Sequence, residues 1–131
     1  MGIITTIKNI FMPEREKLWL LFSFGNPSVL LMFFETTGDE HGVVGNKDHY
    51  GLVMDMPDDF IGFLHTHPSS ATLNASNYDL ATVRAWEKAL DRPLFNIITR
   101  TDGSEINALY GGKPYRHPIS IDFKRHRIDV E

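Results

Sequence analysis

An apolar run that ends in two histidines and a proline is the feature that most constrains how this chain folds. The run Phe60–Leu64 is typical of a buried β-strand, and His-Thr-His-Pro follows it directly. Side chains alternate between the two faces of a strand, so His65 and His67 point to the same side. Pro68 ends the strand because it has no N–H group to donate to a neighbour. The sequence therefore predicts a buried strand over residues 60–67 that presents two imidazoles at its end.

A serine and an aspartate follow after a short loop, at the start of a helical pattern. Ser76 is a favoured N-cap residue, and apolar residues recur at helical spacing up to Leu90, which predicts a helix over residues 76–90. Asp79 then lies in the first turn of this helix. Ser-x-x-Asp is also a common helix-start signature, in which the serine caps the helix and the acid occupies its third position. The motif is compatible with both a capping role and a ligand role.

Three side chains of this segment can converge on one metal ion. His65 and His67 come from the end of a strand, and Asp79 comes from the start of a helix. A catalytic zinc ion is held by three protein ligands and keeps its fourth position open for water. The chain has no cysteine, so a zinc site here must use histidine and carboxylate. Ligand number and spacing therefore predict a Zn²⁺ site made by these three residues.

The order His-x-His-Pro, loop, Ser-x-x-Asp resembles the signature of the JAMM (MPN+, JAB-domain) family of zinc metallopeptidases. In this chain the signature reads H-T-H-P over residues 65–68 and S-N-Y-D over residues 76–79, with a loop one residue longer than the commonest form. The resemblance implies a curved mixed β-sheet with flanking helices, an architecture similar to that of cytidine deaminases. It also implies hydrolysis of a peptide or isopeptide bond in a peptide or protein substrate, such as a ubiquitin-like protein.

The resemblance also implies roles for individual residues. Family members have an upstream glutamate that takes a proton from the metal-bound water and returns it to the leaving amine. Glu40, which precedes a short run of small residues as in the family, is favoured over Glu35, which ends an apolar strand. Glu14 and Glu16 are poor candidates because they lie in a charged stretch before the first strand. Ser76 would donate a hydrogen bond to the developing oxyanion.

The rest of the chain is rich in strand signals. Turn residues separate apolar or alternating runs, which predicts strands over residues 17–24, 29–35, 41–45, 50–54, 94–100, 106–110, 119–123 and 127–130. With the helix over 76–90, these strands predict a mixed α+β fold. No repeat, linker or low-complexity tract divides the 131 residues, so we expect a single domain over residues 1–131.

Composition narrows the class of protein further. The formal net charge of −4 argues against general affinity for nucleic acid or for anionic membranes. The longest apolar stretch, Val29–Phe34, is too short to cross a bilayer, and the N-terminus lacks the apolar run of a signal peptide. We therefore expect a soluble, cytoplasmic protein that binds neither nucleic acid nor membrane.

Two other functions stay open at this level. The first is a binding module, an MPN-type scaffold whose metal is absent or only structural. The position of the glutamate distinguishes it from an enzyme, because catalysis needs that carboxylate within a water's reach of the metal. The second is another zinc hydrolase such as a deaminase. That chemistry usually pairs His-x-Glu with Cys-x-x-Cys, and the chain has no cysteine.

Overall fold

The computed structural model describes residues 15–38 and 47–131, and these form one eight-stranded mixed sheet and two helices. The α+β class is therefore confirmed. The strands are β1 (Lys17–Phe22), β2 (Val29–Thr37), β3 (Phe60–His67), β4 (Phe95–Arg100), β5 (Ile106–Tyr110), β6 (Lys113–Pro114), β7 (Ile119–Asp122) and β8 (Arg127–Val130). The helices are α2 (Lys47–Asp55) and α3 (Asn77–Leu90). No helix within the described ranges is long and apolar enough to cross a membrane.

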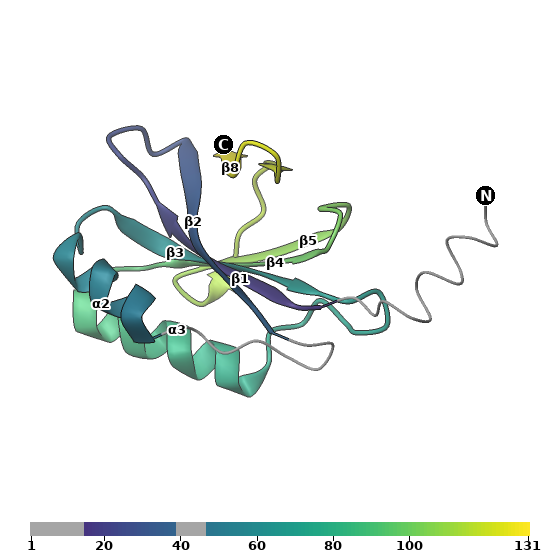
Figure 1. Cartoon of the computed structure of the whole chain (residues 1–131), viewed down its shortest axis with the longest axis horizontal. Coiled ribbons are helices and arrows are strands. Elements are labelled where there is room, and N and C mark those ends of the chain that lie inside the picture. Colours follow the sequence, from purple (N-terminus) through teal and green to yellow (C-terminus); the bar gives the residue numbers. More distant parts are fainter. Residues whose placement is uncertain (1–14, 39–46) are drawn as a thin grey trace.

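The histidine-bearing strand lies in the interior of the sheet. The strand order is β6-β5-β4-β3-β1-β2-β8-β7, so β1 and β4 flank β3 (Figure 1). β3 and β4 are parallel, and the other neighbouring pairs are antiparallel. Parallel neighbours need a long crossover, and α3 is part of the connection between β3 and β4. The start of α3, which follows the histidines in the chain, therefore lies beside the end of β3.

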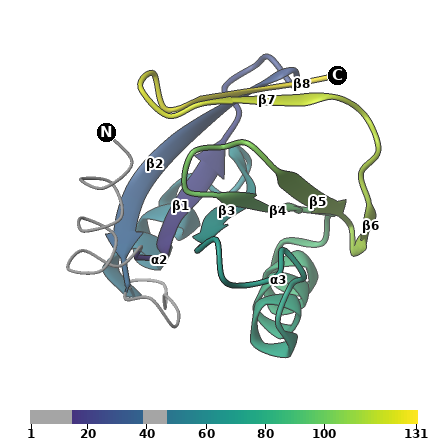
Figure 2. The same cartoon turned by 90° about the vertical axis from the view of Figure 1, so that its right-hand side faces the viewer.

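Both helices cover one face of the sheet, while β7 and β8 curl over the other (Figures 1 and 2). Alternate residues of β1 enter two separate apolar clusters, because a strand covered on both faces buries both sets of side chains. The cluster beneath the helices contains Leu18, Leu20, Phe22, Val53, Phe60, Phe63, Val83 and Leu94. The cluster on the other face contains Trp19, Leu21, Leu30, Met32, Leu64, Phe95, Ile97, Ala108, Ile128 and Val130.

α3 begins at the predicted serine. The Ser76 hydroxyl accepts a hydrogen bond from the backbone N–H of Asp79 at 3.1 Å, and the Asp79 carboxylate accepts one from the backbone N–H of Ser76 at 3.0 Å. This capping box satisfies two N–H groups that a helix start leaves without partners. The helix ends at Asp91, whose left-handed φ of 54° turns the chain toward β4.

Residues 50–54 lie within α2, so the strand predicted there is wrong. Leu52 and Met54 suggest an alternating pattern, but their side chains are 39% and 57% exposed. The buried positions are instead spaced as on a helix: Val53 is fully buried, and Tyr50, three residues earlier, packs against the same cluster.

The remaining strand predictions are confirmed to within two residues at each end, apart from the one over residues 41–45. That segment lies outside the described residues.

Candidate metal centre

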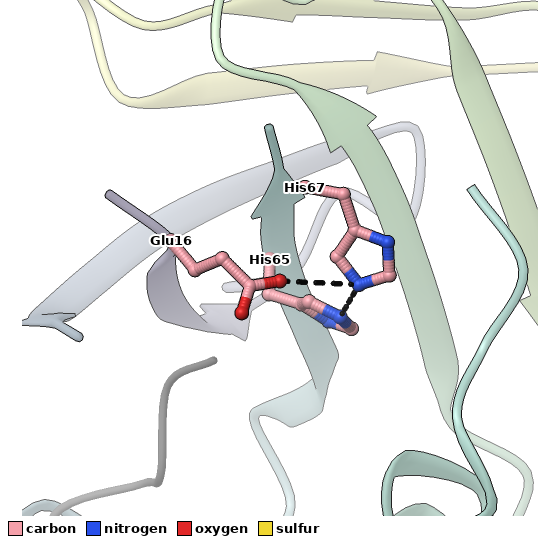
Figure 3. Close-up of side chains that lie close together, drawn as sticks. All are labelled: Glu16, His65 and His67. Carbon is pink, nitrogen blue, oxygen red and sulfur yellow. Dashed lines mark hydrogen bonds and ion pairs between the residues drawn. The ribbon is translucent and has the colours of Figure 1, made fainter. Parts of the chain in front are cut away.

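His65 and His67 converge on one point, as their spacing predicts. Their side chains leave β3 on the helix-covered face, and the two Nε2 atoms lie 2.8 Å apart (Figure 3). Both residues are buried. The backbone is fixed on both sides, since His65 pairs with Leu18 of β1 and His67 pairs with Arg100 of β4. The imidazoles are therefore held in place by the sheet itself.

Glu16 lies beside the histidines. The sequence made it a poor candidate for the site because it precedes the first strand in a charged stretch. Oε1 of Glu16 is 3.5 Å from Nε2 of His67, and the Glu16 side chain is buried (Figure 3). One ligand atom from each of Glu16, His65 and His67 lies within 4.8 Å of the other two. These three buried residues could hold a metal ion.

The pairing of β1 with β3 explains how Glu16 reaches this position. Leu18 lies opposite His65 in an antiparallel pair, so Glu16, two residues earlier, comes opposite His67. Because side chains alternate, Glu16 points to the same face as Leu18, which is the face that carries the histidines. A signal for this was present in the sequence, since Glu16 continues the alternation of Leu18 and Leu20 beyond the start of the strand.

Asp79 approaches the histidine pair from the start of α3. Its Oδ2 lies 3.4 Å from Nε2 of His65, and the same oxygen accepts the N–H of Ser76. Burial raises the pKa of Asp79, but the hydrogen bond and charge of His65 and the bonds from Ser76 outweigh it and bring the pKa to about 2. Asp79 is therefore ionised at neutral pH, which is the state that a metal ligand requires. The carboxylate combines a capping role with a place at the site.

Two of the separations between the donor atoms are close to those of a tetrahedral ion. With metal–ligand bonds of about 2.0–2.1 Å, two ligand atoms of a tetrahedral zinc site are roughly 3.3 Å apart. Glu16 and His67 are 3.5 Å apart and Asp79 and His65 are 3.4 Å apart, whereas the two Nε2 atoms are closer, at 2.8 Å. The group whose ligand atoms all lie within 4.8 Å of one another consists of Glu16, His65 and His67 and does not include Asp79. Two imidazole nitrogens and carboxylate oxygens are also the kind of donor set that Zn²⁺ binds in proteins. The Glu16–His65–His67 group could therefore hold a metal ion, and zinc is one that binds donors of this kind.

A backbone carbonyl sets the orientation of the His67 ring. Nδ1 of His67 lies 2.6 Å from the carbonyl oxygen of Thr72. A carbonyl can only accept, so Nδ1 carries the proton of this hydrogen bond and Nε2 is the nitrogen that faces the site. Metal-binding histidines commonly donate their second N–H group in this way.

The loop that supplies this carbonyl is held by the neighbouring strands. Arg100, at the end of β4, donates a hydrogen bond to the carbonyl of Ala71. Asn107 of β5 donates one to the carbonyl of Leu73 at 2.8 Å. Thr72 lies between these two anchored residues, so its carbonyl is kept beside His67.

The site thus has two buried imidazoles with a carboxylate on each side. No model of a known protein family matches this sequence, and no curated protein matches it. The donor atoms themselves limit what the site can do. Such a set of donors can bind a divalent cation with three side chains and keep one carboxylate for proton transfer.

The glutamates favoured from the sequence are placed differently. Glu35 forms an ion pair with Lys17 at 2.9 Å and lines a pocket together with Thr66. Thr66 lies between the two histidines in β3, so its side chain points to the opposite face of the sheet. Glu35 therefore does not reach the histidines. Glu40 lies outside the described residues, and its role stays a prediction.

Proposed function

We propose that this chain is a zinc-dependent hydrolase of the JAMM type that cleaves a peptide or isopeptide bond. The observation that carries the proposal is the pair of Nε2 atoms flanked by two carboxylates, with Asp79 beside His65 and Glu16 beside His67. The resemblance of residues 65–79 to the JAMM signature supports the same function independently of these distances.

His65, His67 and Asp79 would hold the zinc ion, as the sequence pattern implies. A bound zinc ion lowers the pKa of a coordinated water to about 7 and polarises a carbonyl group. The protein contributes the positions of the donors. The carbonyl of Thr72 keeps His67 in the tautomer that can bind a metal, and Ser76 holds the carboxylate of Asp79 toward His65.

Glu16 is suited to transfer the proton from the water molecule to the leaving amine. Its carboxylate is buried, and its Oε1 lies close enough to Nε2 of His67 for one water molecule to contact both Glu16 and the histidine pair. A carboxylate in such a position can take a proton from water and deliver it to the leaving amine. We therefore give Glu16 the role for which the sequence favoured Glu40.

Ser76 is the proposed donor to the developing oxyanion. Its hydroxyl oxygen accepts the N–H of Asp79, and this leaves the hydroxyl proton available to donate. Loss of one donor of this kind typically costs about 3 kcal/mol of transition-state stabilisation, or roughly 100-fold in rate. The same residue would thus cap the helix and stabilise charge in the reaction.

A cleavage assay coupled to metal analysis tests this function. The full chain is stripped with a chelator, reloaded with zinc and given peptides and isopeptide-linked conjugates, including conjugates of ubiquitin-like proteins. We expect one zinc ion per chain and cleavage only by the reloaded protein. Glu35→Gln is the control for Glu16→Gln, since it makes the same change on the other face of the sheet. A chain that binds zinc and cleaves nothing in the panel would be the binding module.

A further inference from the structure

A side-chain NH₂ group of β4 is buried close to the metal centre and has no hydrogen-bond partner among the described residues. Asn96 is 2% exposed, and its Nδ2 donates to no acceptor among the described residues. Asn96 lies opposite Phe63 in the parallel pair of β4 with β3, so its side chain is on the same face as Phe63 and His65. A buried N–H group without an acceptor costs free energy, and native proteins rarely keep one unless a water or a ligand meets it.

Asn96 lines a small pocket that shares a wall with the metal centre. The pocket has a volume of about 30 Å³, and both His65 and Asp79 line it. The rest of its wall is mainly apolar and aromatic, with Phe63, Val83, Tyr50 and Tyr78. A cavity needs roughly 10–15 Å³ to hold one water molecule, so this pocket accommodates a group of about two heavy atoms. Apolar walls with a few convergent polar groups are typical of a site that recognises a small ligand group.

We propose that this pocket receives the side chain of a serine that adjoins the scissile bond, and that Asn96 donates a hydrogen bond to its hydroxyl oxygen. The proposal rests on the proposed hydrolase function, because His65 and Asp79 then place the pocket next to the reacting carbonyl. The buried NH₂ group of Asn96 requires a hydrogen-bond acceptor, and an alanine at this position of the substrate has none in its side chain.

The size of the pocket excludes the larger side chains. A leucine is too large for a pocket of about 30 Å³. An aspartate side chain, with a carboxyl group in place of the hydroxyl, is likewise too large. A site built to hydrogen-bond a hydroxyl rejects analogues without one more strongly than an apolar pocket rejects a missing methyl group. We therefore expect the pocket to accept a serine side chain and to disfavour an alanine side chain.

A binding experiment tests the pocket without relying on cleavage. The side-chain NH₂ signals of Asn96 are followed by NMR in the ¹⁵N-labelled, zinc-loaded chain while blocked single amino acids are added. We expect N-acetylserinamide to shift these signals with saturation, and N-acetylalaninamide and N-acetylaspartamide to shift them less than a tenth as much. If no probe shifts the signals, or all three shift them equally, the pocket holds only water and the proposal is overturned.

A kinetic experiment then measures the selectivity. Peptides that differ only at the residue next to the scissile bond are compared, and we expect kcat/KM to be about 10-fold higher for serine than for alanine. Asn96→Leu has a similar volume but no donor, and should bring this ratio to within about twofold while cleavage of the alanine peptide continues. Asn74→Leu, on an exposed residue, is the control and should keep the full ratio.

A negative result in the binding experiment and one in the kinetic experiment contradict different parts of the account. If Asn96→Leu does not fold, Asn96→Ala replaces it, and the binding experiment uses the wild-type chain in any case. If no peptide is cleaved, the hydrolase function fails while the NMR shifts still decide whether the pocket binds a hydroxyl side chain. A preference for serine that persists in the Asn96 variants would contradict the role of Asn96.

Discussion

Oε1 of Glu16 lies 3.5 Å from Nε2 of His67, so the residue before β1 lies beside the end of β3. Both side chains are buried, so the carboxylate has lost most of its hydration. A buried carboxylate is stable only when an opposite charge or several hydrogen-bond donors compensate it. A metal ion at the histidine pair would place a positive charge beside this carboxylate.

We expect removal of the Asp79 carboxylate to affect zinc binding and removal of the Glu16 carboxylate to affect the rate of cleavage. Asp79→Asn should weaken zinc binding by more than about 100-fold, because it removes a ligand. Glu16→Gln should keep close to one zinc per chain and lower kcat by about 100-fold or more, because it removes a proton acceptor. Zinc content and initial rates of both variants check this, with Glu35→Gln as control. The opposite result, in which Glu16→Gln loses zinc and Asp79→Asn keeps it, would exchange the two roles.

Ser76 is expected to have separable structural and chemical roles. Ser76→Ala removes both the cap and the hydroxyl, so it should lower the free energy of unfolding by about 1 kcal/mol and kcat by about 100-fold. Ser76→Asp keeps a capping oxygen but no proton to donate, and should lose rate without losing stability. Ser76→Thr keeps both. Urea unfolding and kinetics on the three variants decide the matter, and full activity of Ser76→Asp would remove Ser76 from the chemistry.

The hydrogen bond from Asn107 to the loop is expected to support metal binding at a distance. Asn107→Ala frees the carbonyl of Leu73 and loosens the neighbouring Thr72, which orients His67. Loss of such support typically weakens metal binding by about 10–100-fold. Competition with a zinc chelator measures the change. Asn74→Ala, in the exposed part of the same loop, should leave the affinity unchanged; equal affinities for both variants would contradict the proposed support.

The low pKa of Asp79 predicts how the metal-free protein responds to acid. The pKa falls from the ordinary 3.8 to about 2 on folding. A carboxyl whose pKa is lowered by folding stabilises the folded state above about pH 4, and this stabilisation is lost as the pH falls through about 2. Its size is at most about 2 kcal/mol, because part of the side chain meets solvent.

The measurement compares wild type with Asp79→Asn, which cannot titrate but can still cap the helix. Urea unfolding of the two metal-free proteins should show wild type as the more stable at pH 5, with the difference closing by about pH 2. A difference that is independent of pH across this range would show that the environment of Asp79 is not the one described.

The parts of the site that could be predicted are local in the sequence. The apolar run, the alternation of His65 with His67 and the capping serine all act within one strand–loop–helix segment, and the structure places them as predicted. Asp79 belongs to the same segment. Local propensity and periodicity were sufficient here, because no distant pairing was needed to bring these residues together.

The parts that could not be predicted depend on which strands become neighbours. Glu16 reaches His67 only because β1 pairs with β3 in an antiparallel register, and nothing near Glu16 in the sequence states that partner. Asn96 likewise lies beside His65 only because β4 pairs with β3 in parallel. The error over residues 50–54 had another cause, because the exposed Leu52 and Met54 imitate the alternation of a strand.

Zinc content per chain is the measurement that tests the metal centre most directly. The wild-type chain, stripped and reloaded with zinc and then freed of loose metal by gel filtration, is analysed by elemental mass spectrometry beside His67→Ala, with His49→Ala as a histidine control. We predict one zinc ion per chain for wild type and the control and less than about a tenth for His67→Ala, which loses a ligand. A wild-type chain without zinc, or a His67→Ala chain that retains it, would contradict the metal centre.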